Sequence, residues 1–302
     1  MVNGVSEAMS EFLLCHFAFR VILSQFSVEG LNEDVIDHFK GIVADRVLPE
    51  EMIKQVIILA EGALWKHRMI RPTSHTEKRH PRSPLTESRM ATHLLGVHRA
   101  LLEVGSIELD EAPPSDGLEH DLAQRITATF RRTLVALRMS GKWIRANTRY
   151  LSQAKDSTDP DVGTNGAHAP KSRRTRDGRN HTKEKGNPVV IIGLRLFWQS
   201  YVEFMNILVE AFPIEGLPTL KMPLEEDVEM TGFLPLRKYM LGDAKGAAHT
   251  HGDANNSTSG SNDSEDSRPP GREKVHPNEE QLMRISDILV DAKAVAEDEV
   301  GS

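Results

Sequence analysis

Apolar side chains in this chain recur at helical spacing along stretches that contain no internal proline, and this pattern constrains the fold more than any other feature. Runs of alternating Val, Ile and Thr bounded by turn pairs, which are typical of strands, do not appear. Strands are therefore expected to be few or absent. The predicted helices cover residues 11–28, 32–48, 49–70, 85–104, 118–151 (with Gly141 as a candidate break), 189–212 and a short final helix that begins at 282.

Helix-start signals support two of these segments. Asn32 precedes two acids, an arrangement typical of an N-cap followed by an acidic first turn. Pro49 precedes another acidic pair, and proline is favoured at the first position of a helix. Because the helices arrive in pairs and carry polar stripes on mostly apolar bodies, we predict an all-α fold of stacked α-helical hairpins, an α-α superhelix.

Two long segments contain too few large apolar residues to build a core. Residues 156–188 are rich in Gly, Asn, Asp, Arg and Lys, and residues 242–277 include a stretch of almost only Asn, Ser, Thr, Gly and acids. Burial in such segments cannot offset about 1–2 kcal/mol of backbone ordering per residue. We predict two disordered inserts, the first basic and the second acidic and Ser/Asn-rich. The helical hairpin domain is then expected to comprise residues 11–240 and 279–296.

The most apolar window, residues 189–212, has the length of a membrane span but carries five polar side chains on one helical face. These side chains are Arg195, Gln199, Glu203, Asn206 and Glu210. Because such a face is costly to place in hydrocarbon, we predict a buried helix with one wet stripe. The first residues also lack the basic region of a secretory signal. A cytoplasmic or nuclear protein with no membrane partner is expected.

Composition and motif spacing argue against an enzyme. One cysteine excludes a disulfide framework and a multi-cysteine zinc site, and Cys15 is expected to be a buried, inert thiol. The apolar run before Gly193 resembles the strand of a dinucleotide-binding unit, but the glycines that should follow are missing, and no P-loop tripeptide occurs. Six histidines considered as metal ligands are instead expected to lie at the surface: His75, His80, His93, His98, His249 and His251. We therefore predict no catalytic residues, no cofactor, no metal and no small-molecule substrate.

Residues 122–151 contain many basic side chains and no acid, although the whole chain carries a net charge of −7. Five of these basic residues fall on one face of a helical wheel drawn at about 100° per residue. This candidate basic face comprises Arg131, Arg138, Lys142, Arg145 and Arg149. Such a face can bind nucleic acid or an acidic partner. The alternative is a solvated face that neighbouring acidic helices neutralise.

Four segments, taken in order, resemble one protein family. Residues 131–150 resemble a segment in which an arginine-rich helix turn runs into Lys-Trp and a following Asn, and residues 197–213 match a second helix. Residues 226–236 match the most specific motif, an acidic pair followed by Glu and then Gly-Phe-x-Pro-Leu. Arg284 and Ile285 resemble the closing arginine-isoleucine helix. Together these segments are similar to the DNA/RNA-binding-type helical domain of the Est/SMG family of ever-shorter-telomeres and nonsense-mediated-decay factors.

The resemblance implies a helical hairpin array that serves as a non-enzymatic adaptor or scaffold in nonsense-mediated mRNA decay and RNA surveillance, or with telomerase. Its expected partners are mRNA-decay or telomerase-associated proteins, with RNA or DNA as further candidates. Two alternatives stay open: a direct DNA/RNA-binding module that uses the basic face in telomere-related work, and an inactive truncated fragment. Family members carry a 14-3-3-like tetratricopeptide domain that the residues before Glu11 cannot supply, so recognition of the phosphorylated decay helicase is not carried over.

The most specific of these motifs is expected to be structural. Its residues are Glu226, Asp227, Glu229, Gly232, Phe233, Pro235 and Leu236. Gly232 permits an unusual backbone angle or a close approach. Phe233, Leu234 and Leu236 are suited to fill an apolar groove, and each would contribute about 1.5–3 kcal/mol on burial. The alternative is a hook that faces a partner.

Overall fold

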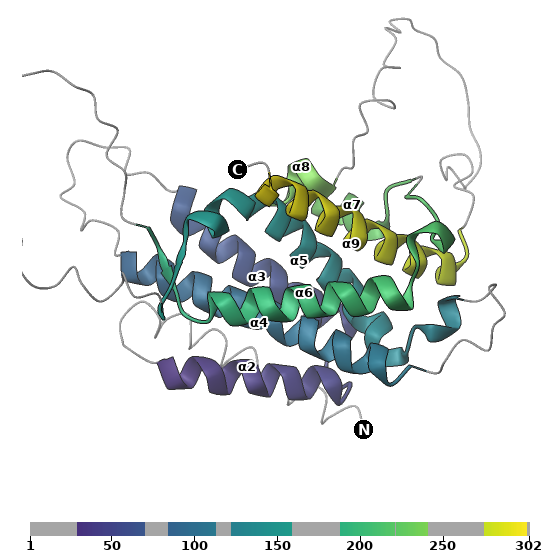
Figure 1. Ribbon diagram of the computed structural model, residues 1–302, viewed down its shortest axis with the longest axis horizontal. Coiled ribbons are helices and arrows are strands. Elements are labelled where there is room, and N and C mark those ends of the chain that lie inside the picture. Colours follow the sequence, from purple (N-terminus) through teal and green to yellow (C-terminus); the bar gives the residue numbers. More distant parts are fainter. Residues whose placement is uncertain are drawn as a thin grey trace, which may run out of the picture.

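The computed structural model describes residues 29–69, 84–112, 122–158, 188–220, 222–240 and 275–300, which form a mostly helical body (Figure 1). Its longer helices are α2 (Glu29–Ala44), α3 (Glu50–Met69), α4 (Pro84–Asp110), α5 (Ala128–Gln153), α6 (Leu194–Ala211) and α9 (Pro277–Val300). The shorter elements are α7 (Glu225–Glu229), α8 (Arg237–Met240), the 3-10 turns η1 (Leu122–Arg125), η3 (Ile214–Gly216) and η4 (Met230–Gly232), and the strands β1 (Lys155–Asp156) and β2 (Val190–Ile191).

The predicted all-α class is confirmed, while the winding of its hairpins into a superhelix stays a prediction. Helices α2, α3, α4 and α9 match predicted helices with shifted ends. The predicted helix at 11–28 lies outside the described residues, together with Cys15. Most of the two predicted disordered inserts, residues 159–187 and 242–274, also lies outside them.

The predicted helical run 118–151 divides into two elements. A 3-10 turn, η1, ends at Arg125, and α5 begins at Ala128 and continues through Gly141 without a break. Thr127 is the N-cap of α5, because its side chain accepts a hydrogen bond from the Phe130 backbone amide at 3.1 Å. Helix α5 contacts α3, α4 and α9 along its length, and this packing supports the helix at a residue of low intrinsic helix propensity.

The predicted helix at 189–212 starts later than expected. Its first residues form β2, which pairs in parallel with β1, so that Lys155 lies opposite Val190 and Asp156 opposite Ile191. Gly193 then adopts a left-handed φ of 75° and ends the strand before α6 begins. The prediction that disorder starts at Asp156 is wrong for that residue, because its buried carboxylate accepts a hydrogen bond from the Arg195 amide at 2.8 Å.

Helices α4 and α5 occupy the centre of the molecule. Helix α4 contacts α2, α3, α5 and α6, while α5 adds contacts with α9. In Figure 1, α2 and α9 lie at opposite edges of the body, with α4 and α5 between them. One continuous apolar cluster joins these layers and includes Phe39, Phe130, Trp143, Phe204 and Ile288.

The predicted wet stripe of α6 is confirmed. All five of its polar side chains are exposed, while Phe197, Phe204 and Leu208 on the opposite face are buried. No described helix is long and apolar enough to cross a membrane.

Candidate functional site

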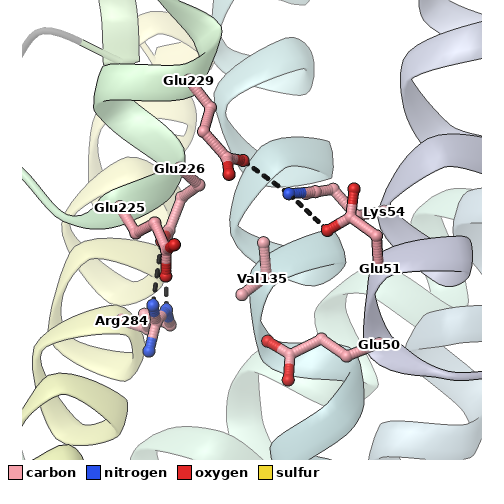
Figure 2. A pocket seen from close by; sticks show the side chains of 8 residues that line it. All are labelled: Glu50, Glu51, Lys54, Val135, Glu225, Glu226, Glu229 and Arg284. Atoms are coloured by element: carbon pink, nitrogen blue, oxygen red, sulfur yellow. Dashed lines mark hydrogen bonds and ion pairs between the residues drawn. The ribbon is translucent and has the colours of Figure 1, made fainter.

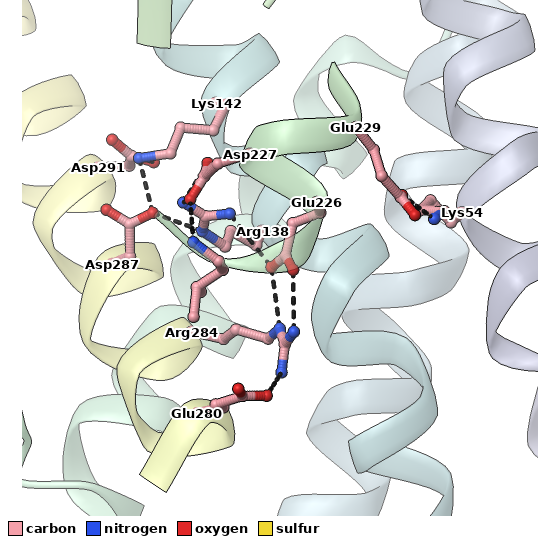
Figure 3. Close-up of polar contacts among 11 residues, drawn as sticks. Lys54, Arg138, Lys142, Glu226, Asp227, Glu229, Glu280, Arg284, Asp287 and Asp291 are labelled. Carbon is pink, nitrogen blue, oxygen red and sulfur yellow. Dashed lines mark hydrogen bonds and ion pairs between the residues drawn. The ribbon is translucent and has the colours of Figure 1, made fainter. Parts of the chain in front are cut away.

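The central charged feature of the molecule is Arg138, a fully buried residue of α5. Its guanidinium Nε lies 2.6 Å from Asp287 Oδ2 on α9. Its Nη1 lies 3.1 Å from Glu226 Oε1, and its Nη2 lies 2.8 and 2.9 Å from the two carboxylate oxygens of Asp227, both on α7 (Figure 3). Three carboxylates therefore surround one cation, as a buried guanidinium requires.

The same pattern continues along α5 and α9. Lys142 Nζ lies 2.7 Å from Asp287 and 2.9 Å from Asp291, and Arg145 lies 2.9 Å from Asp291. Basic residues one helical turn apart on α5 thus face acids one turn apart on α9. This alignment explains why the two helices pack lengthwise against each other.

Arg284 of α9 completes the cluster. Its guanidinium binds both carboxylate oxygens of Glu226 at 2.9 Å, so Glu226 bridges α5 and α9 from its place on α7. Four cations thereby meet four carboxylates. We call this set the ion-pair network: Arg138, Lys142, Arg145, Arg284, Glu226, Asp227, Asp287 and Asp291.

Burial and ion pairing act in opposite directions on the carboxylates of the ion-pair network. Burial raises the pKa of Glu226, but Arg284 and Arg138 outweigh it and leave that pKa below its ordinary value. The pKa of Asp287 is lowered in the same way by Arg138 and Lys142. Burial prevails at Asp227 and Asp291, whose pKa values are raised. Glu226 and Asp287 are therefore the carboxylates that the network most strongly holds ionised.

The predicted basic face on α5 is wrong as an exposed surface. Arg138 and Lys142 are buried in the ion-pair network, and Arg145 is engaged by Asp291. Arg131 is half-buried and donates to the Asn278 side chain at 3.2 Å, which leaves Arg149 as the exposed member. A helical wheel shows which residues share a face but not what covers that face. The alternative prediction, that acids of the same chain neutralise these cations, is nearer to what the structure shows. It differs in that Arg138 and Lys142 are buried and not solvated.

The motif at 226–236 divides between interior and surface. Leu236 is fully buried, and the half-buried Phe233 ring packs over Gly62 of α3. Leu234, which was expected to fill an apolar groove, is 54% exposed. The expectation for Gly232 is also wrong, because its φ is not positive and a Cβ there would meet no atom within 4 Å.

An acidic pocket of about 240 Å³ lies at the edge of the ion-pair network (Figure 2). It is lined by Glu50, Glu51, Lys54, Val135, Glu225, Glu226, Glu229 and Arg284. Lys54 reaches between its two walls, 2.7 Å from Glu51 and 2.5 Å from Glu229, while Glu226 is held by Arg284. Burial raises the pKa of Glu50 above its ordinary value. Three carboxylates of the pocket are thus already paired with its own cations, Lys54 and Arg284.

A second pocket, of about 320 Å³, opens between α3, α5 and the segment that leads into α8. We call it the aromatic groove, and the residues that line it are Leu64, Trp65, Arg68, Met69, Trp143, Ala146, Asn147, Leu234, Pro235, Lys238 and Tyr239. The motif at 226–236 therefore contributes to both pockets, through Glu226 and Glu229 to the acidic one and through Leu234 and Pro235 to the aromatic groove.

Sequence reasoning missed a buried titratable pair. Glu61 of α3 and His98 of α4 are both fully buried, with His98 Nε2 3.5 Å from Glu61 Oε1. The His98 ring also meets Trp143 edge-on, with ring centroids 5.6 Å apart. The expectation of surface histidines is thus wrong for His98. It is equally wrong for the buried His93, whose Nδ1 lies 2.9 Å from Asn32 Oδ1 inside α2, where an N-cap was predicted.

Within the described ranges, no group of three or more His, Cys, Asp or Glu side chains is arranged to hold a metal ion. The other histidines that were expected at the surface, at positions 75, 80, 249 and 251, lie outside those ranges. No protein-family model, curated protein or solved structure matches the chain. The resemblance to the Est/SMG family therefore rests on the sequence motifs alone and stays a prediction.

Proposed function

We propose that this protein is a non-enzymatic adaptor of the Est/SMG type, which assembles mRNA-decay or telomerase-associated proteins on its surface. The observation that carries the proposal is the convergence of three separate motif segments on Glu226. This carboxylate of the acidic motif binds Arg138 of the arginine-rich segment and Arg284 of the final helix.

Convergence of this kind supports the resemblance in physical terms. The bonded residues are 88 and 58 positions apart in sequence, so no local helix rule brings them together. Segments that share a buried ion-pair network depend on one another, because removal of one partner leaves the others as unpaired buried charges. The three motif segments therefore belong to one interior. In this proposal the motif residues hold the helices together through the ion-pair network, and partner proteins bind at the surface of the helical body.

The geometry favours an adaptor over a direct nucleic-acid-binding module. Phosphate binding needs cations that are exposed, yet Arg138 and Lys142 are buried, and the partly exposed Arg145 is paired with Asp291. The aromatic groove, by contrast, is a pocket lined mostly by apolar and aromatic residues, and such residues are enriched at protein-binding sites. Nucleic acid is therefore an outcome of the test and not a part of the proposal.

Affinity capture of the full chain from a nuclease-treated eukaryotic lysate tests this function. Recovery of mRNA-decay, decapping or telomerase-associated proteins is the expected result, and nuclease treatment removes partners held only through RNA. If none of these proteins is recovered, the proposal fails. In parallel, binding of labelled single-stranded RNA and DNA at two salt concentrations should show no dependence on Arg145 or Arg149, since a steep, arginine-dependent salt response would favour the nucleic-acid alternative.

A further inference from the structure

Most residues that line the aromatic groove are apolar or aromatic, polar atoms supply about half of its accessible lining, and one edge is anchored to the core. Trp65 and Met69 of α3 and Trp143 of α5 line it on one side, and Leu234 and Tyr239 line it on the other. Its volume of about 320 Å³ is sufficient for a few bulky side chains of a ligand. The groove therefore has the size and lining of a site for a short peptide segment.

The Leu234 edge is held in place by its sequence neighbours. Phe233 packs over Gly62, and Leu236 is fully buried, so the residues on both sides of Leu234 are fixed to the core. Leu234 itself is 54% exposed and Met69 is 59% exposed. Two exposed, large apolar side chains thus line one pocket, and exposed apolar surface of this kind is common at interaction sites.

The charge at the groove is basic. Arg68 and Lys238 line it, and no carboxylate belongs to its described lining. Arg68 is already engaged within the chain: its Nε lies 3.8 Å from Glu87 Oε1, its Nη1 donates to Asn147 Oδ1 at 2.9 Å, and its guanidinium carbon lies 3.9 Å from the centre of the Tyr150 ring. Lys238 is exposed and makes no ion pair with any residue in the described part of the chain, in contrast to Lys142 in the ion-pair network. Acidic groups of a ligand would thus find a free cation beside an apolar pocket.

We infer that the aromatic groove is the docking site of the proposed adaptor for a partner segment in which bulky apolar side chains are flanked by acidic residues. The apolar side chains enter between Trp65 and Leu234, and the acids pair with the exposed Lys238. A nucleic acid fits less well, because base stacking needs open ring faces. Trp143 is only 2% exposed and Trp65 is half-buried, so neither offers such a face.

Selection of a random peptide library displayed on phage against the full chain tests this inference, and it does not require that the partner be identified first. Enriched peptides should combine Leu, Phe or Trp with Asp or Glu. Leu234→Asp should weaken their binding by about tenfold or more, since a leucine contact is lost and a like charge is introduced. Lys238→Glu should weaken the same peptides and favour versions in which Lys replaces their acids.

Val202→Asp is the matched control, because Val202 is an exposed apolar residue of α6, 55% exposed and absent from the groove lining. It should leave peptide affinity unchanged, and circular dichroism should give the same melting profile for all three variants. The inference is overturned if no acidic-apolar peptide is enriched, or if the enriched peptides bind the Leu234→Asp variant as tightly as the unmodified chain. It is also overturned if single-stranded RNA, and no peptide, loses affinity on that substitution.

The inference rests on the proposed function, but the two can fail separately. If peptides bind at Leu234 and the lysate yields no decay or telomerase-associated protein, the groove stands and the proposed function falls. If those proteins are captured equally well by the Leu234→Asp variant, the proposed function stands and the groove is not its docking site.

Discussion

Arg138 shows how far the environment of one residue can depart from what its sequence neighbourhood suggests. Helix α5 contains no acid, and every acid that Arg138 binds comes from α7 or α9. A buried guanidinium is tolerated only with such partners, because desolvation of an isolated charge costs several kcal/mol. The local sequence contained the cation but not the information that it is buried.

Replacement of Arg138 by Met should destabilise the protein strongly. The methionine fills part of the space, but Glu226, Asp227 and Asp287 lose their shared cation, and broken buried pairs typically cost about 3–5 kcal/mol. Chemical denaturation measures the change in the free energy of unfolding. Arg149→Met, a change at an exposed residue of the same helix, should cost about 0.5 kcal/mol or less. Equal stability of the two variants would show that Arg138 is not buried as described.

The buried Glu61–His98 pair predicts a distinct pH dependence. Burial raises the pKa of Glu61 well above its ordinary value of 4.5 and lowers the pKa of His98 from 6.5 to about 3. A raised carboxyl pKa stabilises the fold below pH 4.5, and this contribution is lost as the pH rises above that value. The lowered pKa of His98 reduces the stability of the fold as the pH falls below 6.5, because the unfolded chain then binds a proton that the folded chain does not.

Glu61→Gln keeps the side-chain shape and removes the ionisable group. Relative to the unmodified chain, this variant should gain stability progressively from pH 4.5 to pH 7, and the two should converge at the acid end of that range. Denaturant unfolding at a series of pH values gives the comparison. A variant that is less stable at neutral pH would mean that Glu61 and His98 form a charged pair, against this account.

At the scale of helices, two glycines provide a matched test of packing. A Cβ at Gly105 of α4 would lie 2.6 Å from Cε2 of the fully buried Phe204 on α6, whereas a Cβ at Gly141 of α5 would meet no atom within 4 Å. Gly105→Ala should therefore destabilise by about 1–3 kcal/mol through overpacking. Gly141→Ala should be neutral or stabilise by about 0.5–1 kcal/mol, because alanine is the better helix former. Thermal unfolding of both variants tests the prediction, and a reversed order would contradict the α4–α6 packing.

The sequence predicted the existence of most helices but placed some of their ends wrongly. Apolar periodicity identified α2, α3, α4 and α9, since each buries one face against a neighbour. It failed before α6, where a continuous run of Val and Ile does not distinguish a strand from a buried helix. The pairing partner of that strand, β1, lies 35 residues earlier by register, Lys155 opposite Val190, and its second residue, Asp156, is the first residue of the segment whose composition predicted disorder.

The candidate sites were less predictable than the helices. Residues 226–236 were singled out as a motif, yet whether each side chain faces inward or outward depends on α3 and α5, which lie far away in the sequence. Leu234 and Leu236 are two positions apart in sequence, yet Leu234 is exposed and Leu236 is fully buried. No spacing rule for an irregular segment separates them, so the aromatic groove emerged only from the three-dimensional arrangement.

At the scale of the whole molecule, the ion-pair network joins parts of the chain that are distant in sequence. Helix α9 begins 124 residues after the end of α5, and its contact with α5 combines apolar packing at Ile288 with the paired charges of Asp287 and Asp291. The same network fixes α7, from which the chain continues into the Leu234 edge of the groove. The ion-pair network and the proposed docking site are therefore joined through α7 and the segment that follows it.

Hydrogen–deuterium exchange of the full chain tests this account most directly. If α9 closes over the cations of α5, central backbone amides of both helices should exchange slowly, and Arg138→Met should accelerate exchange in α7 and α9 more than in α2. Rapid exchange throughout α9 in the unmodified chain, with protection confined to α5, would contradict the central claim that the arginine-rich helix faces inward.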